Sequence, residues 1–138
     1  AFLHSHSYTG NPLACAAALA SLDIFEGDGV LERNRTTAAH MATLAAQVGA
    51  GSRHVADVRQ AGMVVAFELA RDGARDTPFD PALRVGLRAY RAALERGVLL
   101  RPLGDVLYWM PPYCIDEAQL QLLAETTAAA IAEATACA

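Results

Sequence analysis

Two pairs of short apolar segments, each pair joined by only a few turn residues, most constrain the fold of this 138-residue chain. In HVADVRQAGMVVAFELA, apolar and polar residues alternate, which predicts strands near 55–59 and 63–69 hinged at Gly62. In VLLRPLGDVLYWMPP, the segments on either side of Leu-Gly-Asp predict two strands around a tight turn. Such short connections favour antiparallel pairing, because parallel strands need a crossover of roughly a dozen residues.

Helix-start signals surround these strand pairs. Asn11-Pro12 and Asp80-Pro81 each place an N-cap residue before a proline at the first helical position. Asp116 with Gln119 resembles a capping box before a long C-terminal helix, and a further helix is predicted over about 30–48. The helix after Asp80-Pro81 is predicted to bury apolar residues that recur at a spacing of three or four: Leu83, Leu87, Tyr90 and Leu94.

The resulting order of elements, α-α-β-β-α-β-β-α, predicts an α+β fold in which an antiparallel sheet has helices packed on one face. The helix that begins at Pro12 carries small residues on several faces, so it can pack closely against a neighbour, and its Cys15 is predicted to pack in the core. We expect residues 30–138 to form one compact α+β domain. Residues 1–29 are expected to form a loop and a helix that pack against a part of the structure other than this domain.

Composition and charge exclude several classes of function. The net charge of −4 and the lack of a basic run argue against nucleic acid or an anionic membrane as the partner. No apolar stretch approaches the ~18 residues of a membrane span and none resembles a signal peptide, so we expect a cytoplasmic location. All eleven basic residues are arginine, so this chain alone cannot complete chemistry that needs a lysine amine.

The segment His-Ser-His-Ser at positions 4–7 is the first candidate site. His4 and His6 could offer two imidazoles to a metal, but no third ligand accompanies them, and the three widely spaced cysteines form no metal-binding pattern. We therefore predict no metal site. Hydroxyl and backbone N–H groups just ahead of a helix N-terminus instead suit a phosphate.

Arg101 is the second candidate, because it follows an apolar strand segment and a guanidinium can hold a carboxylate with two hydrogen bonds. The alternative is an arginine at a strand end that reaches solvent or pairs with Asp105. Trp109 and Tyr113 are predicted to pack in the core or an interface rather than to form a cofactor platform.

Taken together, HSHSYTGNPLACAAALASLDIF and GVLLRPLGDVLYWMPP resemble the class III (fold type I) pyridoxal-phosphate aminotransferases. DVRQAGMVVAFEL resembles the Arg-x-x-Gly element that precedes a Glu-Leu strand end in this class. Asn11-Pro12 resembles the pair found in the biotin-pathway branch of this class. The enzymes of that branch transfer an amino group from S-adenosylmethionine to 8-amino-7-oxononanoate. The resemblance covers only the C-terminal part of such enzymes. It implies a small α+β domain over 30–138, preceded over 1–29 by a phosphate-side loop and an interdomain helix.

The resemblance also implies a homodimer, the cofactor pyridoxal 5′-phosphate and a role for four residues. Ser7 matches a threonine whose hydroxyl contacts the cofactor phosphate across the dimer interface, and His6 supplies an adjacent contact. Ser5 matches a glycine near the substrate, and Arg101 matches the arginine that binds the substrate carboxylate. The lysine that holds the cofactor lies upstream in the family, so we predict no catalytic residue and no activity for this chain alone. The alternatives are another class III ω-aminotransferase and a non-catalytic interaction module of the same fold.

Overall fold

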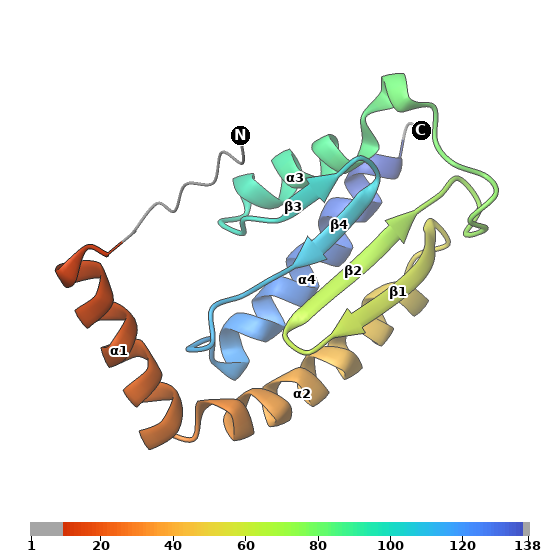
Figure 1. Cartoon of the computed structure of the whole chain (residues 1–138). Helices are drawn as coiled ribbons and strands as arrows, with labels where there is room; N and C mark the ends of the chain where they lie inside the picture. The colour runs from red at the N-terminus through yellow and green to blue at the C-terminus, as the bar shows by residue number, and fades with distance from the viewer. Residues whose placement is uncertain (1–9, 137–138) are drawn as a thin grey trace.

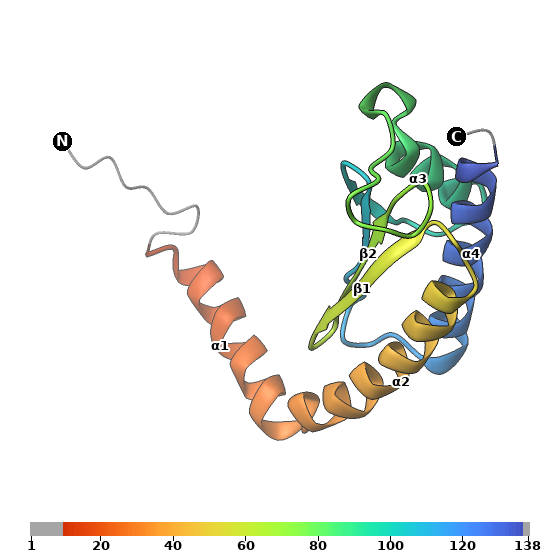
Figure 2. The ribbon, with the colours of Figure 1, turned by 90° about the vertical axis from the view of Figure 1, so that its right-hand side faces the viewer.

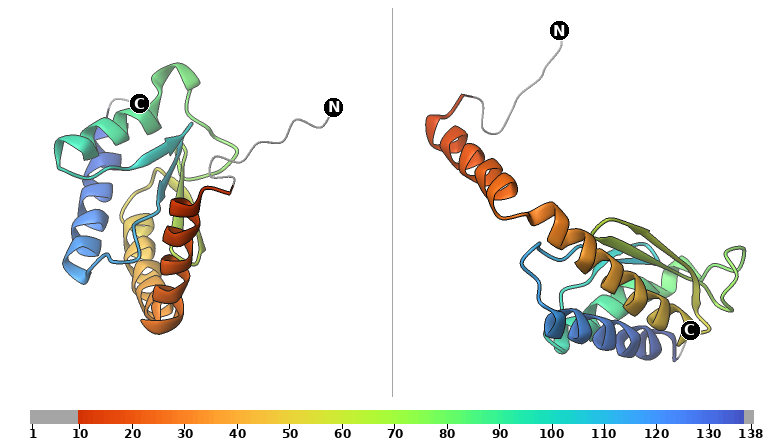
Figure 3. Two further views of the ribbon diagram at one scale, coloured as in Figure 1. Left: turned by 60° about the vertical axis from the view of Figure 1, so that its left-hand side comes forward. Right: turned by 90° about the horizontal axis from the view of Figure 1, so that it is seen from below.

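The computed structural model describes residues 10–136 and contains four α-helices and a four-stranded sheet (Figure 1). The elements are, in order, α1 Pro12–Gly27, α2 Val30–Ala50, β1 Val55–Ala61, β2 Val64–Leu69, the 3-10 turn η1 Pro81–Leu83, α3 Val85–Glu95, β3 Arg101–Leu103, β4 Val106–Trp109 and α4 Glu117–Thr135. The strand order is β1-β2-β4-β3, and every neighbouring pair is antiparallel. Helices α2 and α4 lie side by side on one face, with α3 along α4 (Figure 3). The predicted α+β fold is confirmed.

Both predicted hairpins form. In the first, Ala61 pairs with Val64, so only Gly62 and Met63 connect the strands. Gly62 has φ +56°, a left-handed conformation that glycine adopts without the penalty that a Cβ would bring. In the second hairpin, Leu103 pairs with Val106 around a two-residue Gly-Asp turn. The strands of each hairpin therefore pair antiparallel across a short connection, as the sequence predicted.

Strand alternation divides the sheet into a core face and an open face. The core face carries residues that are almost fully buried against the helices: Val65, Phe67 and Leu69 of β2, and Leu107 and Trp109 of β4. Trp109 is 1% exposed, its ring lies 4.8 Å from that of Phe67 between centroids, and its indole N–H donates to the Thr127 hydroxyl of α4 at 2.9 Å. The predicted packing role of Trp109 is confirmed.

The start of α3 differs from the prediction. Asp80 accepts a hydrogen bond from the Ala82 N–H, but the Asp80-Pro81 signal begins only the 3-10 turn, and α3 starts at Val85 after a left-handed Arg84. The predicted apolar face is also wrong, because Leu83 and Leu94 are exposed. The buried face consists of small side chains that let α3 pack along the alanine-rich α4: Val85, Gly86, Ala89, Ala92 and Ala93.

Helix α1 contributes no buried residue and projects away from the rest of the molecule (Figure 2). Its four large aliphatic side chains are between 55% and 82% exposed: Leu13, Leu19, Leu22 and Ile24. Cys15 is exposed as well, so the prediction that it packs in the core is wrong. Within the described residues, the contacts of α1 lie near its C-terminal end, where the Phe25 ring meets the half-exposed Tyr113 at 5.8 Å between centroids.

The N-terminal turn of α3 is tied to the β3–β4 turn. The Gly86 N–H donates to an Asp105 carboxylate oxygen at 3.1 Å, which replaces the side-chain cap that Arg84 does not supply. A Cβ at position 86 would overlap with the backbone carbonyl of Gly104. Glycine at 86 therefore allows the closest approach between α3 and the hairpin.

We predict that Gly86→Ala destabilises the fold by about 1–3 kcal/mol, the usual cost of overpacking, because the atoms that the new methyl meets are backbone and cannot rotate away. Gly27→Ala is the matched control, since a Cβ there meets open space, and it should be neutral or slightly stabilising. Urea unfolding of both variants and the unsubstituted chain measures the difference. An unchanged midpoint for Gly86→Ala would contradict the close approach.

Candidate functional site

Arg101 is the first residue of β3 and faces the open side of the sheet. It pairs with Tyr108 of β4, whose neighbours Leu107 and Trp109 point into the core, so Tyr108 and Arg101 point the other way. The guanidinium carbon lies 5.8 Å from the centroid of the Tyr108 ring. The predicted carboxylate-binding arginine is thus exposed on a strand, beside an aromatic ring.

A row of paired residues crosses the open face from one edge of the sheet to the other. Arg59 of β1 pairs with Ala66 of β2, Ala66 with Tyr108, and Tyr108 with Arg101. Arg59 forms ion pairs with both Asp57 and Glu68, whereas Arg101 has no ion pair within residues 10–136. Of the two arginines in this row, Arg101 is therefore the one that can form an ion pair with a carboxylate ligand.

The Asp57 cluster shows the opposite arrangement. Asp57 accepts from Arg59 at 2.7 Å and also pairs with Arg75, which ties the loop after β2 to the sheet. Burial raises the pKa of Asp57, but the hydrogen bond from Arg59 and the nearby charges of Arg75 and Arg59 outweigh it, so the net pKa is lowered below its usual 3.8. Hydrogen bonds from Arg59 to Glu68 and Asp57 in turn raise the pKa of that guanidinium. These charges neutralise one another, and their ion pairs hold β1, β2 and the loop after β2 together.

The structural alternative for Arg101 was a side chain that reaches solvent or pairs with Asp105. Arg101 is exposed, which agrees with the first form, whereas the pairing with Asp105 is not found. Asp105 instead accepts from the Gly86 N–H, and no ion pair joins it to Arg101 in the described part of the chain. Arg101 lines an open groove of about 540 Å³ between the end of α3 and the segment that follows β4. Leu99 and Leu103, two positions to either side of Arg101, are 66% and 75% exposed. A carboxylate at Arg101 would therefore sit among aliphatic side chains.

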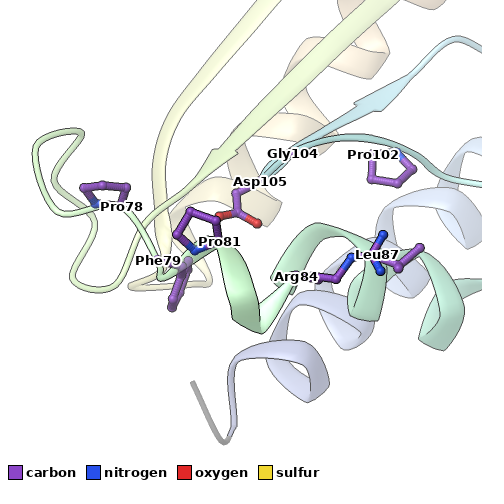
Figure 4. Close-up of a pocket in the computed structure, with 8 residues that line it drawn as sticks. All are labelled: Pro78, Phe79, Pro81, Arg84, Leu87, Pro102, Gly104 and Asp105. Carbon is purple, nitrogen blue, oxygen red and sulfur yellow. The ribbon is translucent and has the colours of Figure 1, made fainter.

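A second groove, of about 510 Å³, lies at the start of α3 and the β3–β4 turn (Figure 4). It is lined by Pro78, Phe79, Pro81, Arg84, Leu87, Pro102, Gly104 and Asp105, and none of the predicted site residues is among them. Asp105 already accepts a hydrogen bond from the Gly86 N–H. This groove therefore lies where α3 packs against the β3–β4 turn, and it is separate from the predicted site residue Arg101.

The other three predicted site residues, Ser5, His6 and Ser7, lie outside the described residues, as do His4 and Cys137. Beyond them the chain enters α1 at Asn11, whose side chain accepts from the N–H groups of Leu13 and Ala14, as the sequence predicted. Between residues 10 and 136 no group of three or more acidic, histidine or cysteine side chains is placed to hold a metal. None of the helices described there has the length and apolar character of a membrane crossing.

Sequence reasoning missed Tyr108. The signal was present, because a two-residue turn between Leu103 and Val106 places position 108 opposite position 101. The direction in which Tyr108 points, however, depends on which strand face meets the helices.

A four-stranded antiparallel sheet with helices on one face and a projecting N-terminal helix define the small C-terminal domain of a fold type I aminotransferase. The profile described as "Aminotransferase class-III" matches residues 2–131. The chain belongs to the class III aminotransferases.

Individual relatives agree with this assignment. Over 134 residues, or 97% of the chain, it is 46% identical to an adenosylmethionine-8-amino-7-oxononanoate aminotransferase of Nitratidesulfovibrio vulgaris and covers 24% of that protein. A crystal structure of the Methanocaldococcus jannaschii enzyme of the same name superposes with a TM-score of 0.86 at 35% identity, over 94% of this chain and 30% of that one. A PLP-bound aminotransferase mutant from Vibrio fluvialis gives a TM-score of 0.88 at 28% identity, over 98% and 30%. The chain thus spans about a quarter of the length of the Nitratidesulfovibrio relative.

The Asp57 cluster predicts a pH dependence of stability. Because the pKa of Asp57 is lower in the folded state, its stabilising contribution is present above about pH 4, the unfolded-state pKa, and is lost as pH falls through the folded-state pKa. Asp57→Asn should therefore lower stability at pH 7 by at most about 1 kcal/mol, as for other partly exposed pairs. That difference should shrink as pH falls below about 4 and through the lowered folded-state pKa.

Urea unfolding at pH 7, 5 and 3 measures this difference. Asp23→Asn, on the exposed face of α1 and outside the described ion pairs, is the matched control. A deficit of Asp57→Asn that is constant across this pH range would show that the cluster does not act through the ionised carboxylate.

Proposed function

We propose that the chain is the C-terminal part of a pyridoxal-phosphate-dependent aminotransferase of biotin biosynthesis. The whole protein would transfer an amino group from S-adenosylmethionine to 8-amino-7-oxononanoate. The observation that carries the proposal is an arginine, Arg101, that lies among exposed leucines and has no ion pair within residues 10–136, in a chain that is 46% identical to a relative named for this acceptor. The acceptor is a carboxylate at the end of an aliphatic chain, which is the chemistry that this surface offers.

The residues before α1 fit the phosphate of the cofactor. Ser7 supplies a hydroxyl and His6 an adjacent contact, and they precede a helix that has no acidic residue in its first turn to repel an anion. Ser5 would lie on the substrate side. Pyridoxal phosphate, when bound, supplies the electron sink for amino-group transfer, while the protein supplies binding and orientation.

Arg101 would bind and orient the substrate without taking part in proton transfer. Its guanidinium can donate two parallel hydrogen bonds to a carboxylate, which fixes both the position and the rotation of that group. The aliphatic side chains of Leu99 and Leu103 exclude water from the bound chain and favour an unbranched hydrocarbon next to the carboxylate. The substrate amine or ketone would then be held at a constant distance from Arg101.

We propose a cytoplasmic homodimer in which residues 5–7 complete the cofactor site of the partner subunit. Residues 1–29 would serve as phosphate-side loop and interdomain helix, and residues 30–138 as the small domain. The exposed leucines of α1 support this division, because a helix with no buried residue has apolar surface for a further layer of protein.

The second candidate is another class III ω-aminotransferase. It is supported by the TM-score of 0.88 with the Vibrio fluvialis aminotransferase, which is slightly higher than the 0.86 of the Methanocaldococcus jannaschii enzyme. Fold similarity therefore does not separate the two activities, whereas sequence identity favours the first. A non-catalytic module of the same fold is the third, and the lack of lysine in this chain is consistent with it.

We predict that the chain alone neither transaminates nor holds the cofactor covalently through a side chain, because it contains no lysine. Incubation with pyridoxal phosphate, reduction with borohydride and peptide mapping test this. A pyridoxyl group on any side chain of the reduced chain would show that the prediction is wrong. The whole protein, treated in the same way, should carry it on a lysine upstream of Ala1.

In the whole protein, Arg101→Ala should lower kcat/KM for carboxylate-bearing substrates by about 10- to 100-fold while the cofactor stays bound. A hydrogen bond to a charged group contributes about 1.5–3 kcal/mol, and 1.4 kcal/mol is a factor of ten. Arg101→Lys should rescue only part of the loss, because an ammonium cannot form the two-pronged contact. Ser7→Ala should do the reverse and weaken cofactor binding more than substrate use.

The matched control for Arg101→Ala is Arg91→Ala, an exposed arginine of α3. Rates of the two half-reactions and the visible spectrum of the bound cofactor are the measurements. If Arg101→Ala left both half-reactions within about twofold of the unsubstituted enzyme, less than ~0.5 kcal/mol, the carboxylate role would be wrong and Arg101 would be a surface residue.

A further inference from the structure

We infer that Tyr108 is a positioning residue that holds the guanidinium of Arg101 ready for a substrate carboxylate; this rests on the proposed function of Arg101. Tyr108 lies directly opposite Arg101 in the β3–β4 pair, and its ring centroid is 5.8 Å from the guanidinium carbon. This is within the roughly 6 Å over which an aromatic face attracts a cation. The two side chains therefore form a cross-strand pair on the open face of the sheet.

Because of the position of β3 in the sheet, Tyr108 is the cross-strand neighbour of Arg101. Strand β3 lies at the edge of the sheet, so β4 is its one hydrogen-bonded neighbour within the described chain. The nearest exposed side chains along the strand direction, Leu99 and Leu103, are aliphatic and offer no attraction to a charge. On the far side of Tyr108 the row continues with Ala66, whose small side chain leaves the ring room. Tyr108 is thus the group placed to order the arginine.

An aromatic face is suited to this task in a way that a carboxylate is not. Arg59, at the other end of the same row, is held by Asp57 and Glu68, which both accept from its Nη1 and neutralise its charge. A ring attracts the flat face of a guanidinium and leaves the N–H groups at its rim free to donate. Tyr108 can therefore reduce the rotamer freedom of Arg101 and keep its charge available.

This arrangement predicts a specific kinetic effect. Without the ring, Arg101 would have to be ordered when the substrate binds, so Tyr108→Leu should raise KM for the carboxylate-bearing acceptor about two- to fivefold. At 1.4 kcal/mol per factor of ten, that is about 0.4–1 kcal/mol. kcat should change little, because the lost interaction serves bound substrate and transition state alike. Tyr108→Phe keeps the aromatic face and should behave as the unsubstituted enzyme does.

The test uses the whole protein with its cofactor and compares these variants in the unsubstituted and the Arg101→Ala backgrounds. Tyr108→Leu should have no further effect once Arg101 is alanine, since a positioning residue acts only through the group it positions. Tyr108→Ile, which suits a strand, is a second non-aromatic variant if Tyr108→Leu does not fold. Tyr90→Leu on α3 controls for the loss of a partly buried tyrosine ring elsewhere.

The outcomes separate this inference from the proposed function. If Arg101→Ala has the predicted large effect but Tyr108→Leu and Tyr108→Ile leave KM unchanged, Tyr108 does not position Arg101 and only this inference fails. It also fails if Tyr108→Leu is equally damaging in both backgrounds, or if Tyr108→Phe is as damaging as Tyr108→Leu. If Arg101→Ala itself has no effect, the proposed carboxylate role fails first. A KM effect of Tyr108→Leu that vanishes in the Arg101→Ala background supports the inference.

Discussion

The buried hydrogen bond from the Trp109 indole to the Thr127 hydroxyl joins the sheet to α4, and the rest of the structure is organised around it. The same indole ring packs against Phe67, so one side chain links β4, β2 and a helix. Because residues along a strand alternate in direction, burying Trp109 turns Tyr108 outward. The pairing of β3 with β4 then places Arg101 on the same outer face. The direction of the candidate ligand-binding side chain thus follows from core packing one residue away.

The open face of the sheet carries two arginines, Arg59 and Arg101, in different surroundings. At the β1 edge, Asp57 and Glu68 neutralise Arg59, and Arg75 ties the following loop to the same cluster. At the β3 edge, Arg101 lies over an aromatic ring among exposed leucines, where its charge is not compensated within residues 10–136. The first arrangement stabilises the fold. The second has the properties of a binding site that further parts of a longer protein would complete, in line with the quarter of the Nitratidesulfovibrio relative that the chain covers.

The predictions that proved wrong share one cause. Asp80-Pro81 is a valid local signal and does cap a turn, but the helix that follows has to begin where Gly86 can approach Gly104 and bond to Asp105. Leu94 stays exposed because α3 packs along the alanine-rich α4 through small side chains, and Leu83 lies outside α3, in η1. Cys15 is exposed because the described chain holds no element that covers α1. In each case the outcome depends on tertiary contacts rather than on neighbours along the chain.

By itself the sequence determined the features that depend on near neighbours along the chain. These are the helix caps at Asn11 and Asp116, whose hydrogen bonds join residues two or three positions apart, and the Gly62 hairpin, whose turn joins Ala61 to Val64. Family resemblance further pointed to Arg101, and it carries the assignment of Ser5, His6 and Ser7 to the cofactor and substrate. Only the tertiary structure decided which face of each strand is buried, that Asp105 binds the start of α3 rather than Arg101, and that Tyr108 lies beside the Arg101 guanidinium on the open face. The short turn already places position 108 opposite position 101, but the face on which both side chains lie depends on packing between segments brought together by the fold.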